Sequence, residues 1–112
     1  MIFARGRHGQ REMLKERIVR VKISGRVQGV CYRAWTVQEA NTRGIKGWVR
    51  NRLNGDVEAA FIGAPEAVEA LCLACWSGPE FAQVEWVEVV EVDRAALPAE
   101  GPETGFHQLR TV

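Results

Sequence analysis

The sequence predicts one α+β domain, and three features carry that prediction. The chain has 112 residues, and domains typically contain about 100–150. Segments with period-two alternation and segments with helical periodicity follow one another in the order strand, helix, strand, strand, helix, strand. Two helices cannot cover both faces of such a sheet, so both should pack on one face. The expected fold is a ferredoxin-like βαββαβ sandwich, an antiparallel sheet with two helices on one face and a short C-terminal strand appended.

The first strand and the first helix flank a glycine-bounded turn. Residues 18–24 alternate β-branched and basic side chains, which indicates a strand. The turn spans residues 25–29. A helix is predicted over residues 32–43, because the glycine that follows it, Gly44, has the conformational freedom that helix C-termini often need.

A hairpin and a second helix come next. Asn54 and Gly55 both tolerate the positive φ of a tight turn, so they predict a hairpin. The strands that it joins are expected at residues 47–52 and 57–62. Pro65 is favourable at the first position of a helix, and Gly78-Pro79 would end that helix. Its apolar residues recur at positions i, i+3, i+4 and i+7, namely Val68, Leu71, Cys72 and Cys75.

The last third of the chain contains two strands separated by a loop. Residues 84–92 predict a strand whose alternation breaks at Val89 and Val90, where we expect a β-bulge. Residues 93–104 are rich in alanine, proline and acids, which indicates a loop. Residues 106–112 are expected to form the short last strand.

Charge is divided unevenly along the chain. Residues 17–55 contain nine basic residues and one acid, whereas residues 56–112 contain two basic residues and eleven acids. A wholly basic surface would suggest nucleic acid, but a basic half beside an acidic half suggests a small anion bound at one place. No run of 18 apolar residues could span a membrane. Three cysteines at no scaffold-like spacing favour a reducing, cytoplasmic setting.

Residues 1–16 show neither strand nor helix periodicity, and they contain four basic residues and two acids. They lack the apolar stretch of a signal peptide. We therefore expect a disordered basic N-terminal arm, followed by one folded domain over residues 17–112. One hypothesis is that translation naturally begins at Met13, because the folded pattern starts shortly after it.

The segment between the first strand and the first helix has the composition of a phosphate-binding loop. Helix starts usually contain Ser, Thr, Asp or Asn as caps, and none stands between Gly25 and Trp35. Two glycines, Gly25 and Gly29, let uncapped N–H groups converge, and arginines at the positive end of the helix dipole favour an anion. The alternative is a tight turn with two solvated arginines. The candidate phosphate-binding residues are Arg26, Val27, Gln28, Gly29, Val30, Cys31, Tyr32 and Arg33.

Asn51 is the second candidate functional residue. Asparagine is disfavoured within strands, and this one lies in a predicted strand that leads into the hairpin. A side-chain amide both donates and accepts hydrogen bonds, which suits it to hold a water molecule. The alternative is a strand end stabilised by local side-chain hydrogen bonds.

Other patterns are better explained by packing. Cys72 and Cys75 have redox-like spacing but lie on the apolar stripe of the second helix, so we expect them in the core. His8 and His107 have no partner at metal-ligand spacing, so the sequence predicts no metal site and no other cofactor. The four tryptophans are expected in the core or at its rim, namely Trp35, Trp48, Trp76 and Trp86.

Two linked motifs lie at the spacing of a known family. They are Gly25-Arg26-Val27-Gln28-Gly29-Val30-x-Tyr32-Arg33 and Gly47-Trp48-Val49-Arg50-Asn51-x-x-x-Gly55-x-Val57-Glu58. With them the chain resembles an acylphosphatase over roughly residues 17–92, although Tyr32 stands where phenylalanine is usual. The resemblance implies metal-free hydrolysis of a small-molecule acyl phosphate, with Arg33 binding the phosphate and Asn51 positioning the attacking water. We expect a cytoplasmic monomer without nucleic-acid or membrane partners.

Two alternatives stay open. The first is a non-catalytic phosphate- or RNA-binding module. Ferredoxin-like sheets in RNA-recognition motifs bind single strands through exposed aromatic residues, and Lys46-Gly47-Trp48-Val49 resembles that pattern weakly. The second is an acylphosphatase-like domain of a larger protein that handles carbamoyl phosphate.

Overall fold

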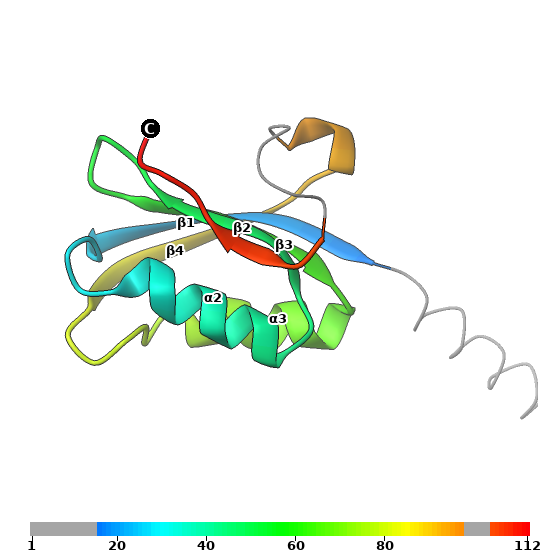
Figure 1. Ribbon diagram of the computed structural model, residues 1–112, viewed down its shortest axis with the longest axis horizontal. Helices are drawn as coiled ribbons and strands as arrows, with labels where there is room; N and C mark the ends of the chain where they lie inside the picture. Colours follow the sequence, from blue (N-terminus) through cyan, green and yellow to red (C-terminus); the bar gives the residue numbers. More distant parts are fainter. Residues whose placement is uncertain (1–15, 98–103) are drawn as a thin grey trace, which may run out of the picture.

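The computed structural model describes residues 16–97 and 104–112 (Figure 1). The predicted N-terminal arm lies outside these residues except for Glu16, which is exposed and forms ion pairs with Lys46 at 3.1 Å and Arg94 at 2.8 Å. Residues 98–103 of the predicted loop also lie outside them. In chain order the elements are β1 (Arg17–Arg26), α2 (Tyr32–Thr42), β2 (Lys46–Asn51), β3 (Val57–Gly63), α3 (Pro65–Ala74), β4 (Gln83–Glu91), the 3-10 helix η1 (Arg94–Ala96) and β5 (Phe106–Gln108).

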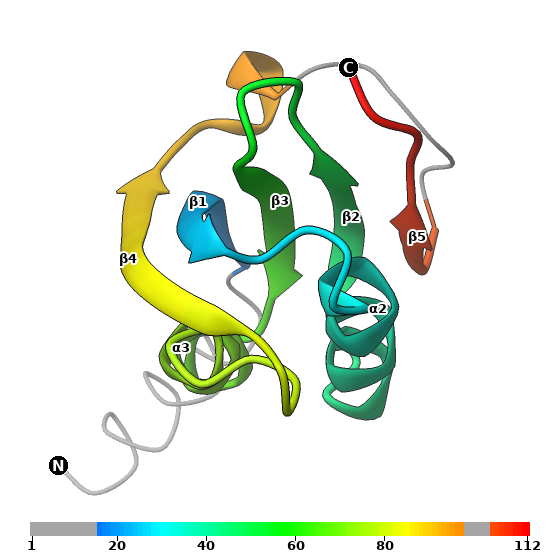
Figure 2. The ribbon, with the colours of Figure 1, turned by 90° about the vertical axis from the view of Figure 1, so that its left-hand side faces the viewer.

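The strands form one sheet in the order β4-β1-β3-β2-β5, and α2 and α3 lie side by side on one of its faces (Figure 2). Strands β1 to β4 pair antiparallel, so the predicted ferredoxin-like βαββαβ arrangement is confirmed. The appended strand β5 pairs parallel with β2 and makes the sheet mixed. The chain leaves β4 and enters β5 at the same end of the sheet, which gives β5 the direction of β2.

The hydrophobic core lies between the sheet and the two helices. In the central strands β1 and β3, alternate residues point toward the helices and are fully buried, and in β1 they are Val19, Val21 and Ile23. Burial of each such side chain contributes roughly 1.5–3 kcal/mol. The predicted stripe of α3 joins this core through Val68, Leu71, Cys72 and Cys75. Burial raises the pKa of the Cys72 thiol to about 11 and that of Cys75 to about 12, so both stay protonated, as packing residues do.

The β-bulge of β4 lies earlier in the strand than the sequence suggested. Val89 and Val90 pair in regular register with β1, so the prediction of a bulge there was wrong. The register shifts instead between Ser24 and Gly25 of β1, opposite the extra residue Glu85. Gly25 permits this close approach, since a Cβ there would lie 2.4 Å from a backbone oxygen of β4. The two valines are each 37% exposed on an edge strand, so adjacent apolar residues fit there without a bulge.

The last strand is shorter than predicted, since β5 covers Phe106–Gln108 rather than residues 106–112. The chain beyond it still follows β2. The N–H group of Leu109 donates to the Val49 oxygen at 2.8 Å, and that of Val112 donates to the Asn51 oxygen at 3.2 Å. The C-terminal segment therefore continues along the edge that contains Asn51.

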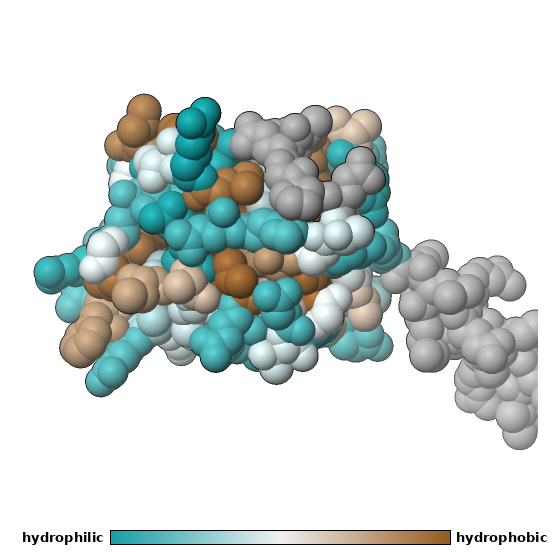
Figure 3. Space-filling model, in the orientation of Figure 1, coloured by the Kyte–Doolittle hydropathy of each residue, from teal (hydrophilic) through white to brown (hydrophobic). Residues whose placement is uncertain are grey.

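The four tryptophans divide between core and surface. Trp48 is buried and Trp35 packs against the core, as expected. Trp76 and Trp86 are 45% and 61% exposed and contact each other edge to face, with ring centroids 5.5 Å apart. In the view of Figure 3, hydrophilic residues cover most of the described surface and apolar ones form small separate areas. Within the described ranges, no helix is long and apolar enough to cross a membrane.

Candidate active site

A pocket of about 370 Å³ lies at the N-terminus of α2. The segment that connects β1 to α2, which crosses in front of the sheet in Figure 2, forms one side of it, and β2 and β5 contribute the other. Both sequence motifs therefore reach one pocket, although β3 separates β1 from β2 in the sheet. The lining residues are Val27, Gly29, Cys31, Tyr32, Arg33, Ala34, Asn51 and Gln108.

The connecting loop, residues 27–31, curls around a glycine and ends in a left-handed residue. Gly29 has a φ of 77°, and Cys31, the N-cap of α2, has φ 66° and ψ 26° with no side-chain capping hydrogen bond. Across the described residues, no protein acceptor is bonded to any backbone N–H of residues 27–34. Such a run of N–H groups at the positive end of a helix dipole is suited to bind an anion.

Arg33 is the second residue of α2, and it lines the pocket. Its Nη1 donates a hydrogen bond to the carbonyl oxygen of Leu109 at 3.0 Å. Among the described residues no carboxylate pairs with Arg33, so they supply no counter-ion for its positive charge. The other N–H groups of the guanidinium form a planar fork that can bind two oxygens of one phosphate.

Asn51 ends β2 and lines the same pocket. Its backbone oxygen accepts the N–H of Val112, but no residue in the described parts of the chain forms a hydrogen bond with its carboxamide. The local side-chain bonding that was the alternative for this residue is therefore not observed. A half-buried amide at the pocket wall can hold a water molecule by donating and accepting at once.

Most other predicted phosphate-binding residues offer backbone rather than side chains. The Val27 side chain is buried, and so is that of Tyr32, whose hydroxyl donates to the Cys75 oxygen at 2.6 Å. Burial raises the pKa of Tyr32 far above its usual value, so the hydroxyl keeps its proton. Arg26 is exposed at the end of β1, and Val30 packs against the core. Neither Arg26 nor Val30 lines the pocket.

Sequence reasoning missed Gln108, which lines the pocket, and Leu109, whose carbonyl oxygen holds the guanidinium. Both belong to the C-terminal segment, and only the parallel pairing of β5 with β2 brings them here. Gln28 was expected in the phosphate-binding loop. Its carboxamide instead reaches the β2–β3 hairpin, where Nε2 donates to the backbone oxygens of Arg52 and Asp56 at 2.8 Å each.

Arg50 of the second motif and the nearby Arg52 lie on the face of the sheet opposite the helices. Arg50, 5% exposed, donates to Glu58 at 2.9 Å, and its Cζ lies 4.8 Å from the ring centroid of Trp48. Arg52 donates to the same Glu58 oxygen at 2.9 Å. Burial alone would raise the pKa of Glu58, but the hydrogen bonds from both arginines hold it below its usual value. One carboxylate thus bridges two guanidinium groups, and these ion pairs stabilise the stem of the hairpin.

The acylphosphatase family model matches residues 19–107. This chain belongs to the acylphosphatase family. It is 48% identical over 99 residues to the acylphosphatase of Nitrobacter winogradskyi, which covers 88% of this chain and 100% of that protein. The structure of an acylphosphatase from Bacillus subtilis matches with a TM-score of 0.74 at 32% identity, over 85% of this chain and 99% of that one. One from Coxiella burnetii matches with a TM-score of 0.73 at 30% identity, over 84% and 93%.

Two further observations bear on the alternatives. The RNA-binding alternative rested on Trp48, but this ring is 5% exposed and is not accessible for base stacking. Among the residues described, no group of three or more His, Cys, Asp or Glu side chains is placed to hold a metal ion. The polar groups that line the pocket are backbone N–H groups, the guanidinium of Arg33 and the carboxamides of Asn51 and Gln108.

Proposed function

We propose that this acylphosphatase binds the phosphoryl group of its substrate through Arg33 and the N–H groups of residues 27–34, and that Asn51 orients the attacking water. The reaction is the hydrolysis of a small-molecule acyl phosphate to a carboxylate and inorganic phosphate. One observation carries the proposal. The loop N–H groups without a protein acceptor, the Arg33 guanidinium and the Asn51 amide belong to the same pocket in the described structure.

These groups suit in-line displacement at phosphorus. The water oxygen forms a bond to phosphorus as the bond to the acyl oxygen breaks, and that electron pair leaves with the carboxylate. The N–H groups and Arg33 stabilise the charge on the phosphoryl oxygens, and the water's proton passes to phosphate or solvent. Because a carboxylic acid has a pKa near ~4, the leaving group needs no general acid.

The same reasoning extends to cofactors and partners. Positioning and charge stabilisation are the main requirements of phosphoryl transfer, and this chain's own residues supply both in our proposal. The enzyme would therefore act without metal or cofactor. Independently of that reasoning, we propose that it is a cytoplasmic monomer with no nucleic-acid partner. The competing proposal is a non-catalytic module that binds phosphate through the same loop.

The test is hydrolysis of benzoyl phosphate by the full chain in the presence of EDTA, with inorganic phosphate as competitor. We expect turnover that survives chelation, together with competitive inhibition by phosphate. Phosphate binding without turnover would favour the non-catalytic module. Turnover that is lost on chelation and restored by a divalent cation would contradict metal independence.

A further inference from the structure

The side chain of Gln28 joins the two halves of the pocket. Its Nε2 donates one hydrogen bond to the backbone oxygen of Arg52 and one to that of Asp56, each at 2.8 Å. The N–H of Arg52 donates to the same Asp56 oxygen at 2.8 Å, which closes the hairpin. Both hydrogens of one amide therefore converge on the stem of the β2–β3 hairpin, one residue beyond Asn51.

In the described chain no other hydrogen bond joins the loop of residues 27–31 to the β2–β3 hairpin, since Arg33 of α2 reaches Leu109 in the C-terminal segment instead. The backbone of residues 27–31 donates to no protein acceptor there, and its one bonded oxygen, that of Cys31, accepts from Trp35 within the first turn of α2. The rest of the contact between loop and sheet is packing, through the buried side chain of Val27. The Gln28 amide thus fixes the distance between the loop and the end of β2.

That distance matters because the two halves of the site come from strands that are not neighbours. The loop follows β1 and Asn51 ends β2, with β3 between them in the sheet. A water held on one half must lie in line with a phosphorus held on the other, and misplacement by about 1 Å can cost on the order of 10²-fold in rate.

We propose that Gln28 is a positioning residue, which acts through Asn51 by locking the phosphate-binding loop to the hairpin stem. This inference rests on the proposed roles of Arg33 and Asn51. Without the two hydrogen bonds, the loop still has its N–H groups and Arg33, so phosphate still binds. The water loses its alignment with the bound phosphorus, so turnover falls.

The experiment is a double-mutant cycle between Gln28→Leu and Asn51→Ala on the full chain, with benzoyl phosphate kcat, phosphate Ki and thermal unfolding measured for each variant. Leucine approximates the size of glutamine but donates no hydrogen bond. We expect Gln28→Leu to lower kcat by about 10-fold or more while phosphate Ki changes less than about threefold. In the Asn51→Ala background the same change should lower kcat by less than about twofold.

Two further variants make the cycle decisive. Gln28→Glu keeps the shape but places a carboxylate against two carbonyl oxygens, so its kcat should fall at least as far as that of Gln28→Leu. Gln38→Leu makes the matched change at an exposed glutamine of α2 and should leave kcat and Ki unchanged. If Gln28→Leu does not fold, Gln28→Glu takes its place in the cycle.

Three results would overturn the inference: an unchanged kcat in Gln28→Leu, an equal loss in both backgrounds, or a phosphate Ki that rises as steeply as kcat falls. Failure of the underlying roles looks different. Wild-type protein without turnover would contradict the proposed function, and Asn51→Ala with normal kcat would contradict the role of Asn51.

Discussion

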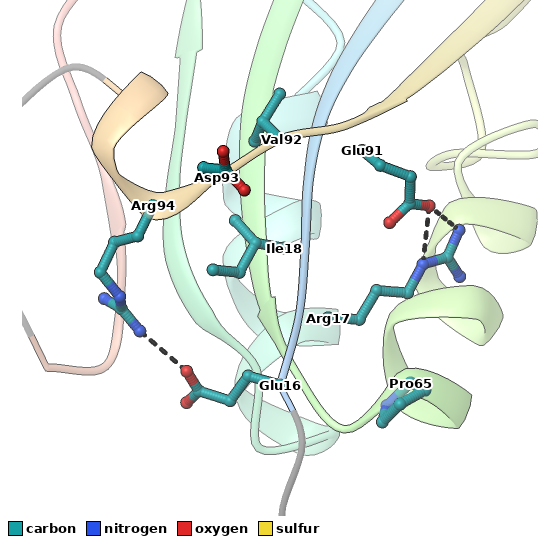
Figure 4. Close-up of a pocket in the computed structure, with 8 residues that line it drawn as sticks. All are labelled: Glu16, Arg17, Ile18, Pro65, Glu91, Val92, Asp93 and Arg94. Carbon is teal, nitrogen blue, oxygen red and sulfur yellow. Dashed lines mark hydrogen bonds and ion pairs between the residues drawn. The ribbon is translucent and has the colours of Figure 1, made fainter. Parts of the chain in front are cut away.

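Two pockets of similar size lie at opposite ends of β1, and both contain arginine. In the one beside Arg17, of about 340 Å³, the cations meet carboxylates: Arg17 contacts Glu91 at 2.6 Å, and Arg94 contacts Glu16 at 2.8 Å (Figure 4). In the one beside Arg33, the guanidinium meets only a carbonyl oxygen among the residues described. A cation whose counter-ion the protein supplies serves the fold, whereas a half-buried cation beside N–H groups without protein acceptors is available to an anionic ligand.

The substitution Arg33→Ala is expected to have the largest effect. It removes the guanidinium that would bind two phosphoryl oxygens, so both turnover and phosphate affinity should fall. The loss of phosphate binding should be about 2–3 kcal/mol or more, and kcat/KM should fall by roughly 10³-fold. Arg33→Lys should rescue little, because an ammonium cannot reproduce the planar fork. Steady-state kinetics with phosphate inhibition measure both quantities. A near-normal phosphate Ki in Arg33→Ala would contradict the proposal that the pocket beside Arg33 binds phosphate.

The substitution Asn51→Ala should separate chemistry from binding within the same pocket. In our proposal the amide orients water rather than phosphate, so kcat should fall by roughly 10²-fold, equivalent to about 2.7 kcal/mol. Phosphate Ki should stay within a few-fold of wild type. Asn51→Asp should be as damaging or worse, since its negative charge would repel the phosphate. If Ki in folded Asn51→Ala, checked by circular dichroism, rises as steeply as kcat falls, Asn51 binds phosphate and the water-orienting role fails.

The parts of the pocket beside Arg33 differ in how far the sequence predicts them. The proposed phosphate-binding loop can be recognised locally, because a helix start without Ser, Thr, Asp or Asn between two arginines departs from ordinary capping. The contribution of Asn51 is visible from strand propensity. The carbonyl of Leu109, the side chain of Gln108 and the target of Gln28 are not visible, because each depends on a contact between distant segments. Periodicity reports which face a residue occupies and not which strand lies beside it.

The ion pairs of the hairpin stem should affect stability more than catalysis. Glu58→Gln removes the carboxylate charge that accepts from both Arg50 and Arg52, so the free energy of unfolding should fall by about 1–3 kcal/mol at pH 7. The folded state lowers the pKa of Glu58, so its contribution is present above the unfolded-state pKa and is lost as pH falls through the lower, folded value. Urea unfolding of the wild type and of Glu58→Gln should therefore show a difference in the free energy of unfolding that shrinks below about pH 4. A difference that persists unchanged in acid would show that packing, and not charge, dominates this site.

The smallest effect is expected from Arg17→Ala, the counterpart of Arg33→Ala in the other pocket. Arg17 contacts Glu69 and Glu91, but its side chain is 26% exposed and those of its partners are 58% and 63% exposed. Solvent and salt screen such pairs, and exposed pairs contribute about 0–1 kcal/mol. The free energy of unfolding should therefore fall by less than about 1 kcal/mol, and the difference should diminish further in high salt, while kcat and phosphate Ki stay at their wild-type values. A rise in phosphate Ki comparable to that of Arg33→Ala would mean that phosphate affinity reflects the total charge of the protein, since the two pockets lie at opposite ends of β1 and share no lining residue.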